Sequence, residues 1–152
     1  MDLFKRLMLI LLLVFSSITA GLAKETSATA AECIIESYLD AWVAVMKVDA
    51  GAGQLDHLMD FFHEDIVYEH PRVGAVIAGK PQVRAGLAEF IGSTRNPDIQ
   101  VRRHITALDV VVVEYDRVYE SRSDGRWQAQ ERHQLTLFEL DGDRIKRIRD
   151  YW

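Results

Sequence analysis

Apolar residues recur at spacings of three and four along the segment 28–48, a pattern typical of a long amphipathic helix with one buried face. The stripe consists of Ile34, Ile35, Tyr38, Leu39, Trp42, Val43 and Met46. Glycines in "DAGAG" (49–53) end this helix, and a shorter stripe over 55–62 predicts a second one. A third helix is predicted to begin at Lys80-Pro81, with proline in its first turn and with Val83, Leu87, Phe90 and Ile91 turned inward.

Strand patterns and turn signals occupy most of the remaining chain. "IVYEH" (66–70) predicts a strand that Pro71 ends, and "AVIAG" (75–79) predicts a short strand or a bend. "GSTRNPD" (92–98) is predicted to be a loop. Four β-rich segments follow, with turns at "SDG" and "DGD", and they cover 99–109, 110–121, 126–140 and 144–152.

Helices that come first and a strand meander that follows predict an α+β domain. We expect a cone-like, curved antiparallel sheet wrapped around the three N-terminal helices. Such a half-open cone leaves a cavity between the sheet and the helices. Side chains that face this cavity are therefore the candidates for binding and chemistry.

The first 23 residues predict a secretory signal peptide. Lys5 and Arg6 give a positive start, "LMLILLLVF" (7–15) is an apolar core, and "GLA" (21–23) places small residues at a cleavage site. The apolar run is shorter than the roughly 20 residues that a membrane span needs. We therefore expect cleavage after Ala23, a mature domain over 24–152, a periplasmic or secreted location, and no stable membrane anchor after cleavage.

Charge and cysteine content narrow the range of partners. The formal net charge is −5 and the chain has no basic cluster, so we expect no nucleic-acid partner. Cys33 is the single cysteine, which excludes an intramolecular disulfide and a thiolate metal site. The histidines lack the spacing of helical metal ligands, and the chain has neither a glycine-rich phosphate loop nor a nucleotide fingerprint. We expect no metal and no cofactor.

Four stretches in this order resemble the SnoaL-like branch of the nuclear transport factor 2-like superfamily. They read "ESYLDAWVAV", "LMDFFHEDIVYEHP", "GKPQVRAGLAEFI" and "LDGDRIKRIRDYW". The resemblance implies a cone-shaped fold with a polar pocket. It leaves the activity open, because the superfamily contains isomerases, hydrolases, cyclases and proteins without chemistry.

The last predicted strand places Asp150 on one face with Ile148 and Trp152. Apolar neighbours raise the pKa of a carboxyl and favour a role in proton transfer. Asp150 also resembles the catalytic aspartate in the closing motif of limonene epoxide hydrolases and the acid/base aspartate of SnoaL-type cyclases. The alternative is a structural aspartate paired with a cross-strand arginine, either Arg117 or Arg132.

Tyr68 and His70 share a face of the strand 66–70. The resemblance to epoxide hydrolases implies that Tyr68 helps to hold an attacking water. In ketosteroid isomerases the residue at the position of His70 is the general base, so imidazole would fill that role here. The alternatives are a half-buried strand tyrosine and a hydrogen-bonded rim histidine.

Further candidates for substrate binding come from the two long strands and the first helix. Alternation turns Tyr115, Arg117 and Tyr119 inward from one strand, and Arg132 and Gln134 from the next. Guanidinium groups suit a carboxylate, an enolate or a phosphate. Trp152, Trp42 and Tyr38 complete the set, and Tyr38 resembles the oxyanion-hole tyrosine of ketosteroid isomerases while fitting equally well into the apolar stripe.

Two departures argue against copying a relative's mechanism. The second carboxylate of limonene epoxide hydrolases is missing, because Tyr115 and Arg117 occupy that segment and Asp116 faces away. The second aspartate of ketosteroid isomerases falls near Gln134 or Thr136, and neither is a carboxylic acid donor.

Three functions follow as hypotheses. The first is a cofactor-independent acid/base isomerase, cyclase or hydrolase that acts on a small, partly apolar molecule, with Asp150, His70 and Tyr68 as the catalytic residues. The second is a non-catalytic module that binds a ligand or a protein through the same cavity. The third is a purely structural dimer. A homodimer through the outer sheet face is also expected, because the valine run 110–113 presents apolar side chains to both faces.

Overall fold

The computed structural model of the protein describes residues 30–152. The predicted leader (1–23) lies outside the described residues and stays a prediction. The first helix is described over 30–46, and most of its buried residues belong to the apolar stripe, among them Ile35 and Met46. Val45 is also buried, whereas Ile34 and Val43 of the stripe are only partly buried. None of the described helices is long and apolar enough to cross a membrane.

Two shorter helices and six strands follow the first helix within the described part. The helices are α2 (Ala52–Met59) and α3 (Lys80–Ala88). The strands are β1 (Phe62–His70), β2 (Ala75–Ala78), β3 (Thr94–Ala107), β4 (Val110–Ser123), β5 (Arg126–Asp141) and β6 (Arg144–Tyr151). Asp124 and Gly125 both have positive φ in the β4–β5 turn, which is the geometry of a two-residue hairpin loop.

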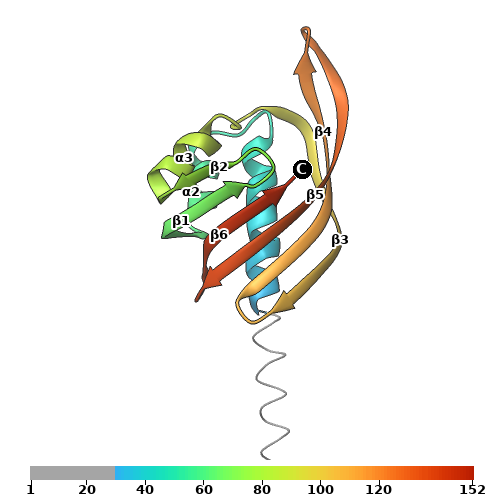
Figure 1. The fold of residues 1–152 in the computed structure, drawn as a ribbon. Helices are drawn as coiled ribbons and strands as arrows, with labels where there is room; N and C mark the ends of the chain where they lie inside the picture. Colours follow the sequence, from blue (N-terminus) through green and yellow to red (C-terminus); the bar gives the residue numbers. More distant parts are fainter. Residues whose placement is uncertain (1–29) are drawn as a thin grey trace, which may run out of the picture.

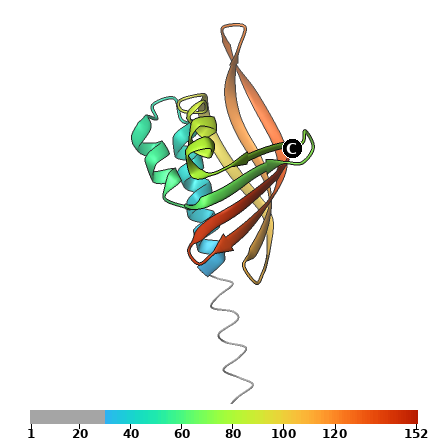
Figure 2. The same cartoon turned by 60° about the vertical axis from the view of Figure 1, so that its left-hand side comes forward.

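The strands form one curved sheet in the order β2-β1-β6-β5-β4-β3. Figures 1 and 2 show the helices lying against the concave side of this sheet, with the end of the β4–β5 hairpin projecting beyond it. The predicted α+β cone is therefore confirmed. The expected antiparallel sheet is wrong in one pairing, because β1 runs parallel to β6 and the sheet is mixed.

This parallel pairing joins two strands that are far apart in the sequence. Tyr68 of β1 pairs with Ile148 of β6, and Thr136 of β5 pairs with Asp150 of β6. Paired residues point to the same face of a sheet. The strand register therefore brings the side chains of Tyr68, Thr136 and Asp150 close together on the concave side of the sheet.

Two sequence predictions on the chain between α3 and β3 need correction. The segment 92–98 is not a loop throughout, because β3 begins at Thr94 and pairs with β4. A bulge at Asn96 and Pro97 interrupts the alternation of inward and outward side chains that would have identified this strand in the sequence. The bulge arises because proline has no N–H to donate to the neighbouring strand and because Asn96 has positive φ. Phe90 lies beyond the end of α3 and is 43% exposed, so it is not a core residue.

Candidate functional site

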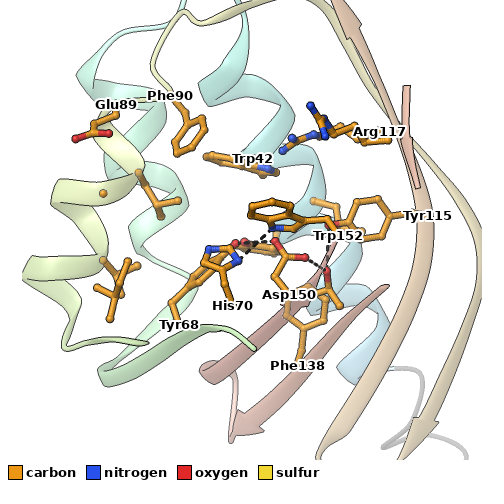
Figure 3. A pocket seen from close by; sticks show the side chains of 18 of the residues that line it. Trp42, Tyr68, His70, Glu89, Phe90, Tyr115, Arg117, Phe138, Asp150 and Trp152 are labelled. Carbon is orange, nitrogen blue, oxygen red and sulfur yellow. Dashed lines mark hydrogen bonds between the residues drawn. The ribbon is translucent and has the colours of Figure 1, made fainter. Parts of the chain in front are cut away.

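A cavity of about 490 Å³ lies between the concave face of the sheet and the helices. This volume is in the range of sites that hold small organic ligands. Much of its wall is apolar, and the apolar side chains are Leu39, Trp42, Ile77, Val83, Leu87, Phe90 and Phe138. Most of the polar lining residues come from β1, β4, β5 and β6, and Figure 3 labels Tyr68 and His70 of β1, Arg117 of β4 and Asp150 of β6 among them.

Asp150 is the central polar residue of this cavity and is only 8% exposed. Its Oδ1 accepts hydrogen bonds from Thr136 Oγ1 (2.8 Å) and Gln134 Nε2 (3.4 Å), and its Oδ2 accepts one from Tyr68 Oη (3.3 Å). Tyr115 Oη lies 3.1 Å from Thr136 Oγ1. Because the single proton of Thr136 is directed at Asp150, Tyr115 donates in that contact.

No arginine forms an ion pair with Asp150 within the described residues: neither Arg117 nor Arg132 lies within 4.0 Å of its carboxylate. Burial raises the pKa of the Asp150 carboxyl, although the hydrogen bonds from Thr136 and Tyr68 and the charge of Arg117 act in the opposite direction. The alternative of an aspartate satisfied by a cross-strand arginine is therefore not what the structure shows.

Tyrosines surround the carboxylate. Burial raises the pKa of Tyr38, Tyr68 and Tyr115 above the usual tyrosine value, and the nearby negative charge of Asp150 adds to the effect. These phenols therefore stay protonated at neutral pH and act as hydrogen-bond donors. Tyr38 packs edge-on against Phe138 with ring centroids 5.4 Å apart, which fixes its ring at the cavity wall.

His70 and Trp152 form a pair at the edge of the cavity. Trp152 Nε1 donates a hydrogen bond to His70 Nδ1 (3.2 Å), and Arg72 donates to the backbone oxygen of Trp152 (2.7 Å). Because an indole nitrogen can only donate, Nδ1 of His70 carries no proton in this arrangement. The proton of the neutral imidazole is therefore on Nε2.

Arg117 and Arg132 lie opposite each other on β4 and β5 and line the cavity. Arg132 Nε donates to Tyr119 Oη (3.2 Å), and the Arg117 guanidinium lies 5.0 Å from the centre of the Tyr119 ring. Burial alone would raise the pKa of Tyr119, but the hydrogen bond from Arg132 and the charge of Arg117 outweigh it, and the pKa is lowered.

A charge cluster on the opposite face of the sheet holds β1 and β6 in register. Glu69 of β1 accepts hydrogen bonds from both Arg147 and Arg149 of β6, the latter at 2.6 Å. The hydrogen bond from Arg149 lowers the pKa of Glu69 more than burial raises it. The cluster stabilises the parallel pairing that aligns Tyr68 with the neighbourhood of Asp150.

Comparison with known proteins identifies the family. A model of the SnoaL-like domain matches residues 35–148, which is most of the chain. The chain belongs to the SnoaL-like family. No curated protein shows significant sequence similarity to this SnoaL-like chain.

Solved structures share the fold of this SnoaL-like protein at low sequence identity. An LEH-like epoxide hydrolase from M. tuberculosis is 20% identical, with a TM-score of 0.64 over 82% of this chain and 84% of its own. A candidate SnoaL-like polyketide cyclase from Shewanella putrefaciens is 14% identical, with a TM-score of 0.66 over 80% and 88%. A protein with a ketosteroid isomerase-like fold from Catenulispora acidiphila, solved in complex with trimethylamine, is 22% identical, with a TM-score of 0.60 over 78% and 84%.

The structure brings together nearly all of the site residues predicted from the sequence. Those that line the cavity are Tyr38, Trp42, Tyr68, His70, Tyr115, Arg117, Tyr119, Arg132, Asp150 and Trp152. Gln134 is the exception: it is 2% exposed and does not line the cavity, but its Nε2 donates a hydrogen bond to Asp150. The roles assigned to these residues stay predictions.

Thr136 makes the shortest hydrogen bond to Asp150, and sequence reasoning did not assign it that role. The signal was the register of the β5–β6 hairpin, but a bulge between Glu139 and Leu140 shifts that register by one residue. If the register set by the pair Asp141–Arg144 continued without the bulge, Leu135 would lie opposite Asp150. With the bulge, Thr136 takes that position.

Within residues 30–152, no group of three or more histidine, cysteine, aspartate or glutamate side chains is arranged to hold a metal ion. The polar side of this SnoaL-like cavity instead offers hydroxyl, indole, imidazole and guanidinium groups. These groups can donate hydrogen bonds to a ligand, while the carboxylate of Asp150 can accept a proton.

Proposed function

We propose that this SnoaL-like protein is a cofactor-independent acid/base enzyme acting on a small, partly apolar molecule, with Asp150 as the proton acceptor. One observation carries the proposal: a buried carboxylate projects into a ligand-sized cavity, held by uncharged donors, and no cation of the described part of the chain forms an ion pair with it. A general base needs a pKa raised toward the working pH, and burial moves Asp150 in that direction.

The two oxygens of Asp150 have different roles in this proposal. Oδ1 already accepts two hydrogen bonds, from Thr136 and Gln134, whereas Oδ2 accepts one, from Tyr68. Each carboxylate oxygen has about two lone pairs. Oδ2 therefore keeps a lone pair for the proton of a substrate C–H group or of a water molecule, and Tyr68 orients that oxygen.

Negative charge that develops on the substrate needs a donor. Tyr38 lines the cavity and stays protonated, and His70 keeps its proton on Nε2 while Trp152 occupies Nδ1. Either group could donate to an enolate or alkoxide oxygen formed when Asp150 takes a proton. His70 then serves as a neutral donor, whereas the sequence analysis predicted a base.

The pH dependence of turnover tests the proposal. We would assay small ketones for exchange of α-protons with deuterated solvent, and epoxides and lactones for hydrolysis. Activity should fall as the pH drops through the raised pKa of Asp150, above the usual aspartate value near 4, because the protonated carboxyl cannot accept a proton. Ligand binding without exchange or hydrolysis at any pH would contradict an enzyme and support the binding module.

We also propose that the protein forms a homodimer through the outer sheet face, defined here as the face bearing Ile105, Leu135 and Tyr151. These side chains are 63%, 39% and 38% exposed. Ile105 pairs with Val112, Leu135 pairs with Glu114, and Tyr151 pairs with Leu135, which places all three on the side of the sheet away from the cavity.

Leu135→Glu should give a monomer in light scattering after size exclusion, because a carboxylate would lie inside the interface. Leu108→Glu, at the 83% exposed turn between β3 and β4, should stay dimeric. A monomeric wild type would contradict the proposal.

A further inference from the structure

Arg117 and Arg132 are two cations whose charge the described part of the protein does not balance. They face each other across β4 and β5, and like charges directly opposite each other destabilise a sheet. Of the acidic residues in the cavity wall, Asp150 and Glu89, neither lies within ion-pair distance of them. Their side chains contact the Tyr119 phenol instead.

Within the described residues, the surroundings of this pair offer no acidic partner. The inward-facing neighbours on the two strands are uncharged, and β3 contributes an isoleucine opposite Arg117; these residues are Tyr115, Tyr119, Gln130, Gln134 and Ile99. The Nε of Arg117 is buried and has no hydrogen-bond partner among residues 30–152. An unsatisfied buried donor is costly, so its presence in a cavity wall points to a ligand that accepts its hydrogen bond.

Four other arginines of the sheet have acidic partners. Arg102 pairs with Asp116 at 2.6 Å, Arg103 pairs with Glu114, and Arg147 and Arg149 pair with Glu69. Those pairs lie on the outer face. The unbalanced arginines lie on the inner face, where a ligand can reach them.

We infer that Arg117 and Arg132 form the binding site for a carboxylate group of the substrate, and that the substrate class is small carboxylic acids with an apolar body. Two adjacent guanidinium groups match the two oxygens of a carboxylate. Trp42, Leu87 and Phe90 supply apolar wall for the rest of the molecule. The inference rests on the proposed function, because it assumes that the same ligand presents its reacting atom to Asp150.

The arginine pair lies some distance along the sheet from Asp150, so the two sites would contact different ends of such a ligand. Arg132 precedes Thr136, the partner of Asp150, by four residues on β5, which is about 13 Å of extended chain. Figure 3 shows Arg117 and Asp150 entering the cavity at different heights, with the Trp152 indole drawn between them. The arginines therefore bind a charge that the ligand already carries, at a distance from the atom where Asp150 acts.

Binding measurements with a matched series of ligands test this inference. The carboxylates are 3-phenylpropionate, 4-phenylbutyrate and hexanoate, and each is compared with its primary amide. Phenyl phosphate and trimethylamine are included to test a phosphate and a cation. The readouts are titration calorimetry and the fluorescence of the tryptophans, of which Trp42 and Trp152 line the cavity. We expect the carboxylates to bind about tenfold or more tightly than the amides, since one charge-assisted contact contributes about that much.

Variants locate the carboxylate. Arg117→Gln should weaken carboxylate binding by about tenfold and leave amide binding within about twofold. Arg122→Gln is the matched control, because Arg122 lies on the same strand, pairs with Trp127, and faces the opposite side. It removes the same charge and should change neither affinity. The melting temperature of Arg117→Gln should equal or exceed that of the wild type, since a repulsion is removed.

The outcomes separate this inference from the proposed function. Asp150→Asn should bind the carboxylates at least as tightly as the wild type while losing turnover. Four results would each overturn the carboxylate site: equal affinity for amide and carboxylate, tighter binding of phenyl phosphate or trimethylamine, no binding of any carboxylate, or unchanged carboxylate binding in Arg117→Gln. This would hold even if Asp150-dependent turnover of a neutral substrate were found. Selective carboxylate binding without turnover would support the site and contradict the enzyme.

Discussion

Asp150→Asn should lower turnover by about 10²- to 10⁴-fold, because general-base catalysis contributes that much and asparagine cannot accept the proton. Asparagine has nearly the same shape. Its amide oxygen can accept from Thr136 at the position of Oδ1, and its NH2 group at the position of Oδ2 can donate to the hydroxyl oxygen of Tyr68. The cavity should therefore keep its ligand affinity. The measurement is kcat and Kd for a substrate found by the exchange and hydrolysis assays.

The same substitution should raise stability at neutral pH. The folded-state pKa of Asp150 lies above its unfolded value, so the charged form is disfavoured by folding, and this penalty is fully present above the folded pKa. The penalty disappears below the usual aspartate pKa, where both states are protonated. Thermal unfolding of wild type and Asp150→Asn should therefore differ at pH 7 and converge in acid.

Asp116→Asn is the matched control for both measurements. Asp116 is 5% exposed but lies on the outer face, where the hydrogen bonds from Arg102 and His133 lower its pKa. Its charge stabilises the fold above the unfolded pKa, and that contribution is lost as the pH falls through the folded pKa. Asp116→Asn should thus lower stability at pH 7 and keep turnover. Asp150→Asn with near wild-type turnover, or with a large loss of stability, would show that Asp150 is structural.

Phe62→Ala should lower the free energy of unfolding by about 3–5 kcal/mol, the usual cost of removing a buried phenyl group. Phe62 is 1% exposed, its ring lies 5.7 Å from that of Tyr38, and it pairs with Ile145. Removing it leaves a void where the first helix meets β1 and β6. Urea unfolding followed by circular dichroism would measure the loss, and the melting temperature should fall by roughly 10–20 °C.

Phe90→Ala provides the contrast for the core prediction. Phe90 is 43% exposed, lines the cavity, and packs edge-on against Trp42 with ring centroids 5.5 Å apart. Its removal should change stability by no more than about 1 kcal/mol, since exposed positions contribute little. It should weaken the binding of apolar ligands instead. Equal losses of stability in the two variants would contradict this assignment of core and cavity mouth.

Local patterns in the sequence predicted the elements well, because period and turn chemistry are local properties. The first helix, the two long hairpins and the glycine turns follow from residues within a few positions of one another. The β1–β6 pairing does not, since nothing in 66–70 specifies a partner about 80 positions later. The family resemblance predicted the cone-shaped fold, but an antiparallel sheet was expected and this parallel pairing was not predicted.

The candidate site also contains some residues that local patterns predicted and others that they could not. Alternation placed Tyr115, Arg117 and Arg132 on the inner face, and the structure has them there. The role of Thr136 could not be read from alternation, because the bulge at Glu139 and Leu140 moves every later pair by one. Gln134 faces inward, yet it is covered by the side chains around it, and burial depends on packing that no pattern along one strand shows.

The parallel pairing of β1 with β6 has a consequence for how the chain folds. The hydrogen bond between Tyr68 and Asp150 closes a loop of 82 residues, so it contributes nothing until the last strand is present. During synthesis the β1–β2 hairpin can form early, but its inner edge stays unpaired until residue 144 and beyond have emerged. Contacts of such long range slow folding, and the candidate active site is therefore among the last parts of the domain to form.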